Sequence, residues 1–207
     1  MTNFKDFLLR NNNTKYYSTV GTVFVILICI IVIIYISTSP DDTIKIPGQV
    51  DRPYWPNVEE DGKTYRPIIV SDIGVQTDDS DSGVFDSWSL THISHGVIFF
   101  FVLMGIRTLL QKTFNISIPI SALFLTTFLG ELTWEYIENS AAFVKKLQAV
   151  NMTKDGDSIV NSIGDILSCL TGFLMASISP AFALCYIIVT EYLLYPRSLT
   201  GVLVNTL

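Results

Sequence analysis

The sequence is poor in charged side chains, and basic ones are the scarcer kind. Of 207 residues only 15% are charged, with 13 Lys and Arg against 19 Asp and Glu, whereas soluble domains usually carry about 25% charged residues. Hydrophobic residues make up 49% of the chain. This balance is typical of an integral membrane protein, and nothing in it resembles the basic face that nucleic-acid binding requires. We therefore expect membrane lipid as a partner and no nucleic acid.

Several chemical signatures are also missing. The three cysteines, Cys29, Cys169 and Cys185, all lie inside apolar runs, where cysteine behaves as a small hydrophobe. Neither a disulfide framework nor a thiolate metal site is therefore supported. The chain contains no H-E-x-x-H and no G-x-S-x-G, so the standard zincin and hydrolase-elbow motifs are absent. The paired Glu-x-x-His motifs of di-iron bundles are missing as well.

What the sequence does contain is a series of long apolar runs. The first, at 19–38, is long enough to cross the roughly 30 Å hydrocarbon core as a helix. A cleaved signal peptide is the alternative, although the run exceeds the usual signal length of about 7–15 apolar residues. Four further apolar segments follow, at 88–110, 116–143, 158–178 and 181–195. Short connections imply antiparallel neighbours. The prediction is an all-α polytopic membrane helical bundle with about five transmembrane helices.

The chain divides into four parts on this interpretation. Residues 1–18 form an N-terminal cytoplasmic segment, and residues 19–38 form a transmembrane anchor helix. Residues 39–87 hold eleven acidic against four basic residues and five of the eight prolines, which predicts an extramembrane loop with little regular structure. Residues 88–207 form a four-helix membrane core with a polar site and a short C-terminal tail. Basic residues near the helix ends favour a cytoplasmic N-terminus, although three lysines at 145–154 argue against it.

Three of the predicted core helices carry polar side chains at helical spacing. The spacing is i, i+3 in "THISHG", i, i+4, i+7 in "GELTWEYIENS" and i, i+4, i+8 in "GDSIVNSIGD", so each set lies on one helix face. Antiparallel threading brings all three sets to the same depth. A charged side chain at mid-bilayer costs at least about 2.5–3.5 kcal/mol, so we expect these residues to face one another. The predicted shared site consists of His92, His95, Glu131, Glu135, Glu138, Asp157, Asn161 and Asp165.

The depth of the glutamates within this site differs. Glu131 lies two turns deeper than Glu138, about 10 Å at 1.5 Å per residue. Glu131 should therefore be the more completely shielded from bulk water. Glu138 is shallow enough to reach water in the manner of other long polar side chains near helix ends. We further expect His95, Glu135 and either Asp157 or Asn161 to lie within direct or one-water reach of one another.

The site is compatible with more than one chemistry. A hard or borderline divalent metal ion is the cofactor to expect from histidine and carboxylate ligands, and the candidate ligands are His92, His95, Glu135 and Asp157. With a carboxylate as general base, the protein would be a membrane-embedded hydrolase or transferase acting on a lipid or envelope head group. Alternatively, the same cluster would hold a cation or relay protons in a binding or permeation module. A structural or accessory membrane protein with an internal hydrogen-bond network is the third hypothesis.

Three segments carry a resemblance to a known family. "SWSLTHISHGVIFFF", "GELTWEYIENS" and "GDSIVNSIGDILSCLTGF" resemble the motifs of an uncharacterised bacterial integral-membrane family of the domain-of-unknown-function kind, over roughly residues 84–207. The chain departs from that family at Thr91, where serine is usual, and its 39–87 loop is larger. More distantly, the layout is similar to VanZ-like membrane proteins. The resemblance implies a membrane fold and supports the polar site, but it implies no reaction.

Overall fold

The structure is a computed structural model of the whole chain, and it describes six stretches of it. These are residues 43–44, 47–53, 58–60, 63–65, 83–149 and 156–194. The predicted anchor helix at 19–38 and the N-terminal segment before it lie outside the described residues, as does the C-terminal tail beyond residue 194. The orientation of the N-terminus therefore stays a prediction.

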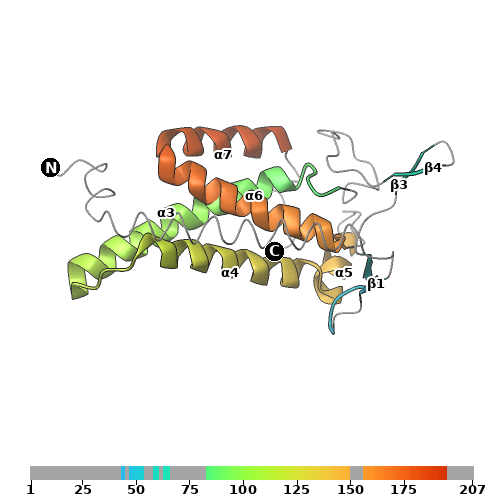
Figure 1. Cartoon of the computed structure of the whole chain (residues 1–207), viewed down its shortest axis with the longest axis horizontal. Coiled ribbons are helices and arrows are strands. Elements are labelled where there is room, and N and C mark those ends of the chain that lie inside the picture. Colours follow the sequence, from blue (N-terminus) through green and yellow to red (C-terminus); the bar gives the residue numbers. More distant parts are fainter. Residues whose placement is uncertain are drawn as a thin grey trace.

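Helices dominate the described residues, as the all-α prediction requires (Figure 1). The described residues that precede them in the chain include two short two-stranded antiparallel ladders, in which β1 pairs with β2 and β3 pairs with β4. The strands are β1 (Thr43–Ile44), β2 (Arg52–Pro53), β3 (Val58–Glu60) and β4 (Lys63–Tyr65). The helices are α3 (Ser89–Phe114), α4 (Ile120–Glu138), α5 (Ala141–Ala149), α6 (Ile159–Ile178) and α7 (Pro180–Leu194).

Helices α3 and α6 form the central pair of the bundle and run parallel, with α4 antiparallel to both (Figure 1). Glycine allows their close approach. A Cβ atom built on Gly96 would lie 1.7 Å from the carbonyl oxygen of Cys169, and one built on Gly172 would lie 1.9 Å from that of Ile93. Small residues at a helix interface permit such backbone contact, in membranes as in water. Any side chain at these two glycines would therefore force α3 and α6 apart.

Beyond this glycine contact, toward the C-terminal ends of α3 and α6, the helices enclose an apolar core. Phe100 of α3, Phe124 of α4 and Phe173 of α6 are all buried, and the Phe173 ring stands edge-on to the other two at centroid distances of 5.3 and 5.5 Å. Edge-to-face pairs of this kind are a preferred aromatic geometry. The aromatic contacts therefore join α3, α4 and α6 into one body, which fixes the ends of these helices relative to one another.

The third apolar segment differs from the single helix predicted over 116–143. Helix α4 ends at Glu138, and a separate short helix, α5, begins at Ala141. Asn139 causes the break because it is used as a cap: its backbone N–H donates to the Glu135 carbonyl, and its side-chain amide donates to the same oxygen at 3.0 Å. Side chains that bond the backbone locally offer an alternative to helix continuation. The chain thus turns at the end of α4, beside the predicted polar site.

Two of the described helices are long and apolar enough to cross a membrane, namely α3 with 26 residues and α6 with 20. Helix α6 is the core helix of the pair, since 67% of its apolar window is buried within the protein against 28% for α3. Helix α7, with 15 residues, is apolar but shorter. These helices support a helical protein with membrane association, and the number of five spans stays a prediction.

Candidate functional site

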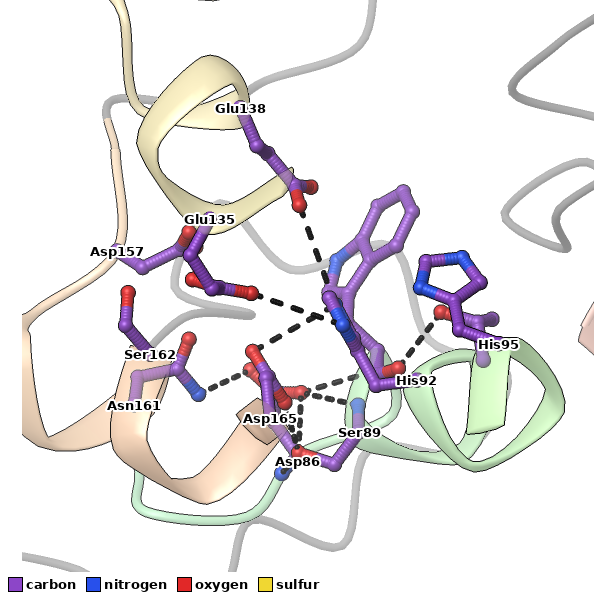
Figure 2. Close-up of polar contacts among 12 residues, drawn as sticks. Asp86, Ser89, His92, His95, Glu135, Glu138, Asp157, Asn161, Ser162 and Asp165 are labelled. Atoms are coloured by element: carbon purple, nitrogen blue, oxygen red, sulfur yellow. Dashed lines mark hydrogen bonds and ion pairs between the residues drawn. The ribbon is translucent and has the colours of Figure 1, made fainter. Parts of the chain in front are cut away.

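The predicted polar residues lie at one end of the bundle, where α3 and α6 begin and α4 ends (Figure 1). All eight are among the described residues. Seven are buried, and His95 keeps 12% of its side chain exposed. Glu131 is fully buried and Glu138 is 6% exposed, in the order expected from their depth along α4. The three helices therefore direct their polar faces into one shared interior region (Figure 2).

His92 stands at the centre of this region. Its Nδ1 atom forms a short contact with Glu131 Oε1 and lies 3.6 Å from Glu135 Oε1. Its Nε2 atom lies 3.7 Å from Asp165 Oδ2 and 4.0 Å from Glu138 Oε2 (Figure 2). Three carboxylates from α4 and one from α6 thus surround a single imidazole, and the His92 side chain is only 3% exposed.

His95 occupies the edge of the same region, one turn along α3. Its Nδ1 atom lies 3.3 Å from Glu131 Oε1, so one carboxylate oxygen contacts both imidazoles. The His95 ring packs edge-on against His92 at 4.9 Å and against Trp134 at 5.7 Å between ring centroids. Glu131 therefore fixes the orientation of two imidazole rings at once.

The start of α6 and the residues just before it place further amide and carboxylate side chains in this region. Ser158 caps the helix by accepting from the backbone N–H of Asn161 at 3.2 Å, which is a common role for serine at this position. The Asn161 side chain donates to Asp86 Oδ2 at 3.1 Å. Asp165 Oδ1 accepts from the Ser89 hydroxyl at 2.6 Å. Asp157 is buried, and its backbone N–H donates to Asn139 Oδ1 at 2.7 Å.

The sequence interpretation missed two charged members of this region. Asp86 lies just before α3, where its Oδ1 atom accepts from the backbone N–H groups of Trp88 and Ser89. Arg52 belongs to β2, and its side chain is buried against the start of α6. Both come from the segment 39–87, whose sequence offers no periodic pattern. For Arg52 the surplus of acidic residues on the helices was the available signal, because buried acids need basic partners; no such signal existed for Asp86.

Arg52 makes three contacts with α6 and the residues before it. Its Nε atom donates to the carbonyl oxygen of Asp157 at 2.5 Å, and Nη2 donates to that of Ser158 at 3.2 Å and, in a short contact, to the Ser162 hydroxyl. Burial lowers the pKa of the guanidinium, and the negative charge of Asp157, followed by Glu135 and Glu138, opposes that shift. Arginine nevertheless keeps its charge under all ordinary conditions. Arg52 is therefore a fixed positive charge beside the acidic cluster.

Some buried polar atoms of the site have no hydrogen-bond partner of normal geometry among the described residues. They include Oε2 of Glu131, both carboxylate oxygens of Glu135 and Oδ1 of Asn161. Leaving a buried polar atom without a partner costs about 1–3 kcal/mol, and more for a charged group. Such atoms mark positions where a proton or a bound ion would be stabilising.

Two sets of side chains bring metal-ligating atoms within 4.8 Å of one another. One is His92, His95 and Glu131, and the other is His92, Glu135 and Glu138. Of the four residues predicted as ligands, His95 and Glu135 therefore fall into different sets that share His92, and Asp157 is in neither. Imidazole together with carboxylate suits borderline divalent ions.

Comparison with known proteins places the chain among bacterial relatives. It is similar to a UPF0314 protein of Paracoccus denitrificans, with 30% identity over 113 residues, 54% of each chain. It is 33% identical to a UPF0314 protein of Sphingopyxis alaskensis over 104 residues, 49% of this chain and 51% of the relative. A UPF0314 protein of Brucella anthropi is 30% identical over 99 residues, 47% of this chain and 46% of the relative. The chain thus spans about half the length of the curated relatives it matches.

No solved structure matches the chain at a significant level, and the distant likeness to VanZ-like proteins stays a prediction. A family profile does match. It is described as a protein of unknown function, DUF2585, and it aligns with residues 68–203, which include all of the described helices, α3 to α7, and all eight predicted site residues. The chain belongs to the DUF2585 family.

Proposed function

We propose that this chain is an integral membrane protein whose buried histidine–carboxylate cluster binds a divalent metal ion. The observation that carries the proposal is a charge imbalance. Within the part of the chain that the structure describes, the basic groups that face the cluster are Arg52 and two imidazoles, which together supply at most three positive charges. Buried charges persist only when they are paired or bind metal. The carboxyl groups buried here number six: Asp86, Glu131, Glu135, Glu138, Asp157 and Asp165.

The contacts of His92 favour one of the two ligand sets. Glu131 already contacts Nδ1 of His92, and metal-binding histidines usually donate their second ring N–H to such a carboxylate. This arrangement leaves Nε2 as the ligand atom, on the side where Glu138 and Asp165 lie. Glu135 belongs to the same ligand set as Glu138, with ligating atoms of His92, Glu135 and Glu138 within 4.8 Å of one another, and its oxygens lack hydrogen-bond partners of normal geometry. The proposed ligands are therefore His92, Glu135 and Glu138, with Glu131 orienting His92.

The outer surface supports the membrane part of the proposal. Large apolar side chains are exposed on three helices, for example Leu109 on α3 at 62%, Leu129 on α4 at 50% and Ile188 on α7 at 69%. Soluble monomers rarely expose extended apolar surface of this kind. Lipid chains are the partner that such a surface fits, so we propose that these helices face the bilayer. A multi-pass arrangement with a cytoplasmic N-terminus is part of the same proposal.

Metal analysis of the purified protein tests the metal site. The full chain in detergent or nanodiscs would be stripped with chelator, incubated with Mn²⁺, Zn²⁺ or Mg²⁺, desalted and analysed for bound metal. We expect one Mn²⁺ or Zn²⁺ per chain in the wild type and loss of at least tenfold in affinity for Glu135→Gln. Glu191→Gln on α7 is the matched control, because it makes the same chemical change outside the cluster. Wild-type protein that retains no metal would refute the proposal.

The position of the cluster favours an enzyme as a second candidate. It lies at the ends of the helices α3 and α6, and the ends of spanning helices lie at the level of lipid head groups. A metal-assisted hydrolase or transferase acting on a lipid or envelope head group would place its reacting bond there, with a glutamate as general base. Incubation with vesicles of bacterial lipid and analysis of released head groups tests this candidate. Turnover should require metal and disappear in Glu135→Gln.

A further inference from the structure

Residues 47–53 form a strap that is attached to the site from outside the helical bundle. The backbone N–H of Val50 donates to the carbonyl oxygen of Asn139 at 3.2 Å, and the N–H of Ala141 donates to that of Gly48 at 3.1 Å. The 47–53 strap therefore docks on the corner between α4 and α5, immediately after Glu138. Its two backbone hydrogen bonds give a direct measure of whether it is docked.

Arg52 carries the positive charge of the strap into the polar region. Arg52 is only 4% exposed, and its contacts reach the start of α6 at Asp157, Ser158 and Ser162. All three acceptor atoms in these contacts are neutral oxygens. The attraction between Arg52 and the carboxylates is therefore Coulombic and does not depend on these hydrogen bonds. Coulomb interactions are stronger in a buried region than in water.

We infer that Arg52 is a built-in counter-ion of the cluster, so that docking of the 47–53 strap and binding of a metal ion oppose each other. The inference rests on the proposed metal site. A divalent ion at His92, Glu135 and Glu138 would lower the negative potential that attracts the guanidinium, and it would repel the guanidinium directly. Coupling of this kind is reciprocal: if the ion weakens docking of the strap by some factor, then docking of the strap weakens binding of the ion by the same factor.

The direction in which metal affinity changes when Arg52 is replaced distinguishes a counter-ion role from a purely structural role. If Arg52 only held α6 against the end of α4, replacing it would disorder the ligands and weaken metal binding. If it acts as a counter-ion, removing its charge should strengthen binding. Arg52→Gln removes the charge and keeps an amide donor, whereas Arg52→Lys keeps the charge and changes the shape. The two variants therefore test charge and geometry separately.

The experiment measures metal affinity and strap docking in the full-length protein. Mn²⁺ binding would be titrated for the wild type, Arg52→Gln and Arg52→Lys. Hydrogen exchange would be followed in the peptides that contain Val50 and Ala141, with and without saturating Mn²⁺. We expect Arg52→Gln to bind roughly tenfold more tightly, within the usual range for coupled sites, and Arg52→Lys to bind like the wild type. Saturating Mn²⁺ should speed exchange at both peptides in the wild type.

The outcomes separate the two proposals. Wild-type protein that binds no metal overturns the metal site, and the counter-ion role of Arg52 falls with it. Wild-type protein that binds Mn²⁺, together with a folded Arg52→Gln that binds equally or less tightly, overturns only the counter-ion role. If Arg52→Gln does not fold, exchange in the wild type decides: unchanged or slower exchange on adding Mn²⁺ overturns the inference, and faster exchange supports it.

Discussion

Gly96 offers the sharpest test of how the fold creates the site. A Cβ atom at this position would lie 1.7 Å from the Cys169 carbonyl oxygen and 2.8 Å from the Phe173 backbone nitrogen. Contacts of a Cβ atom below 3.0 Å are essentially never found, and the obstacle at Gly96 is backbone. In Gly96→Ala, helices α3 and α6 must therefore separate locally by roughly 1 Å or more, since rigid packed interiors accommodate extra volume only by shifting.

The magnitude follows from two opposing effects. Overpacking a close-packed interior by one methyl group costs about 1–3 kcal/mol. Replacing glycine by alanine within a helix returns about 0.5–1 kcal/mol. The free energy of unfolding should thus fall by up to about 2.5 kcal/mol, which for a chain of this size corresponds to a Tm lower by up to roughly 10 °C. Gly105 of the same helix has nothing within 4 Å of its Cβ position, so Gly105→Ala should raise the Tm.

Thermal unfolding of both variants in the same detergent, followed by circular dichroism, measures this difference. Gly96→Ala should also weaken metal binding, because His92 lies one turn before Gly96 and faces Asp165 across the same interface at 3.7 Å. A Gly96→Ala protein as stable as Gly105→Ala would show that α3 and α6 are not in backbone contact. Glycine packing could then not be the cause that brings His92 and Asp165 together.

Three further predictions concern two other contacts and the membrane topology. Glu131→Gln should keep the fold and lower metal affinity about 10–100-fold, the usual effect of removing a carboxylate that orients a ligating histidine; equal metal affinity of Glu131→Gln and wild type would contradict that role. Asn139→Ala leaves the buried Asp157 N–H without its 2.7 Å acceptor and should lower the free energy of unfolding by about 1–3 kcal/mol, measured by denaturation in mixed micelles. A reporter fused after Leu207 should lie on the side opposite the N-terminus if five helices span the membrane, and same-side termini would exclude an odd number of spans.

The helical part of the site was predictable from the sequence because helical spacing is a local property. His92 and His95 share one face of α3, and Glu131, Glu135 and Glu138 share one face of α4, wherever those helices pack. Their common depth followed from the antiparallel course of α3 and α4 alone. The sequence did not predict the end of α4 at Glu138. Asn139 caps the helix through local bonds to Glu135, and the remaining oxygen of its side chain accepts from the backbone N–H of Asp157, 18 residues further along the chain.

The site residues that the sequence did not predict depend on contacts between distant segments of the chain. Arg52 donates to residues more than a hundred positions away, and no periodicity in the acidic loop marks it among the other basic residues there. Asp86 likewise meets Asn161 only through the folded bundle. Charge balance was a signal for Arg52 alone, because it required a buried base without identifying which one, and it gave no indication of the acid Asp86.

The backbone contact between α3 and α6 connects the packing of the protein with the chemistry of the site. The helices run parallel and meet where Gly96 faces Cys169. One turn earlier on each helix stand His92 and Asp165, so the same register that places glycine against the backbone places imidazole against carboxylate. A larger residue at Gly96 would widen both contacts together. The closeness of the buried acids to His92, and with it the charge imbalance that a metal ion would relieve, is therefore a direct consequence of the glycine packing of α3 and α6.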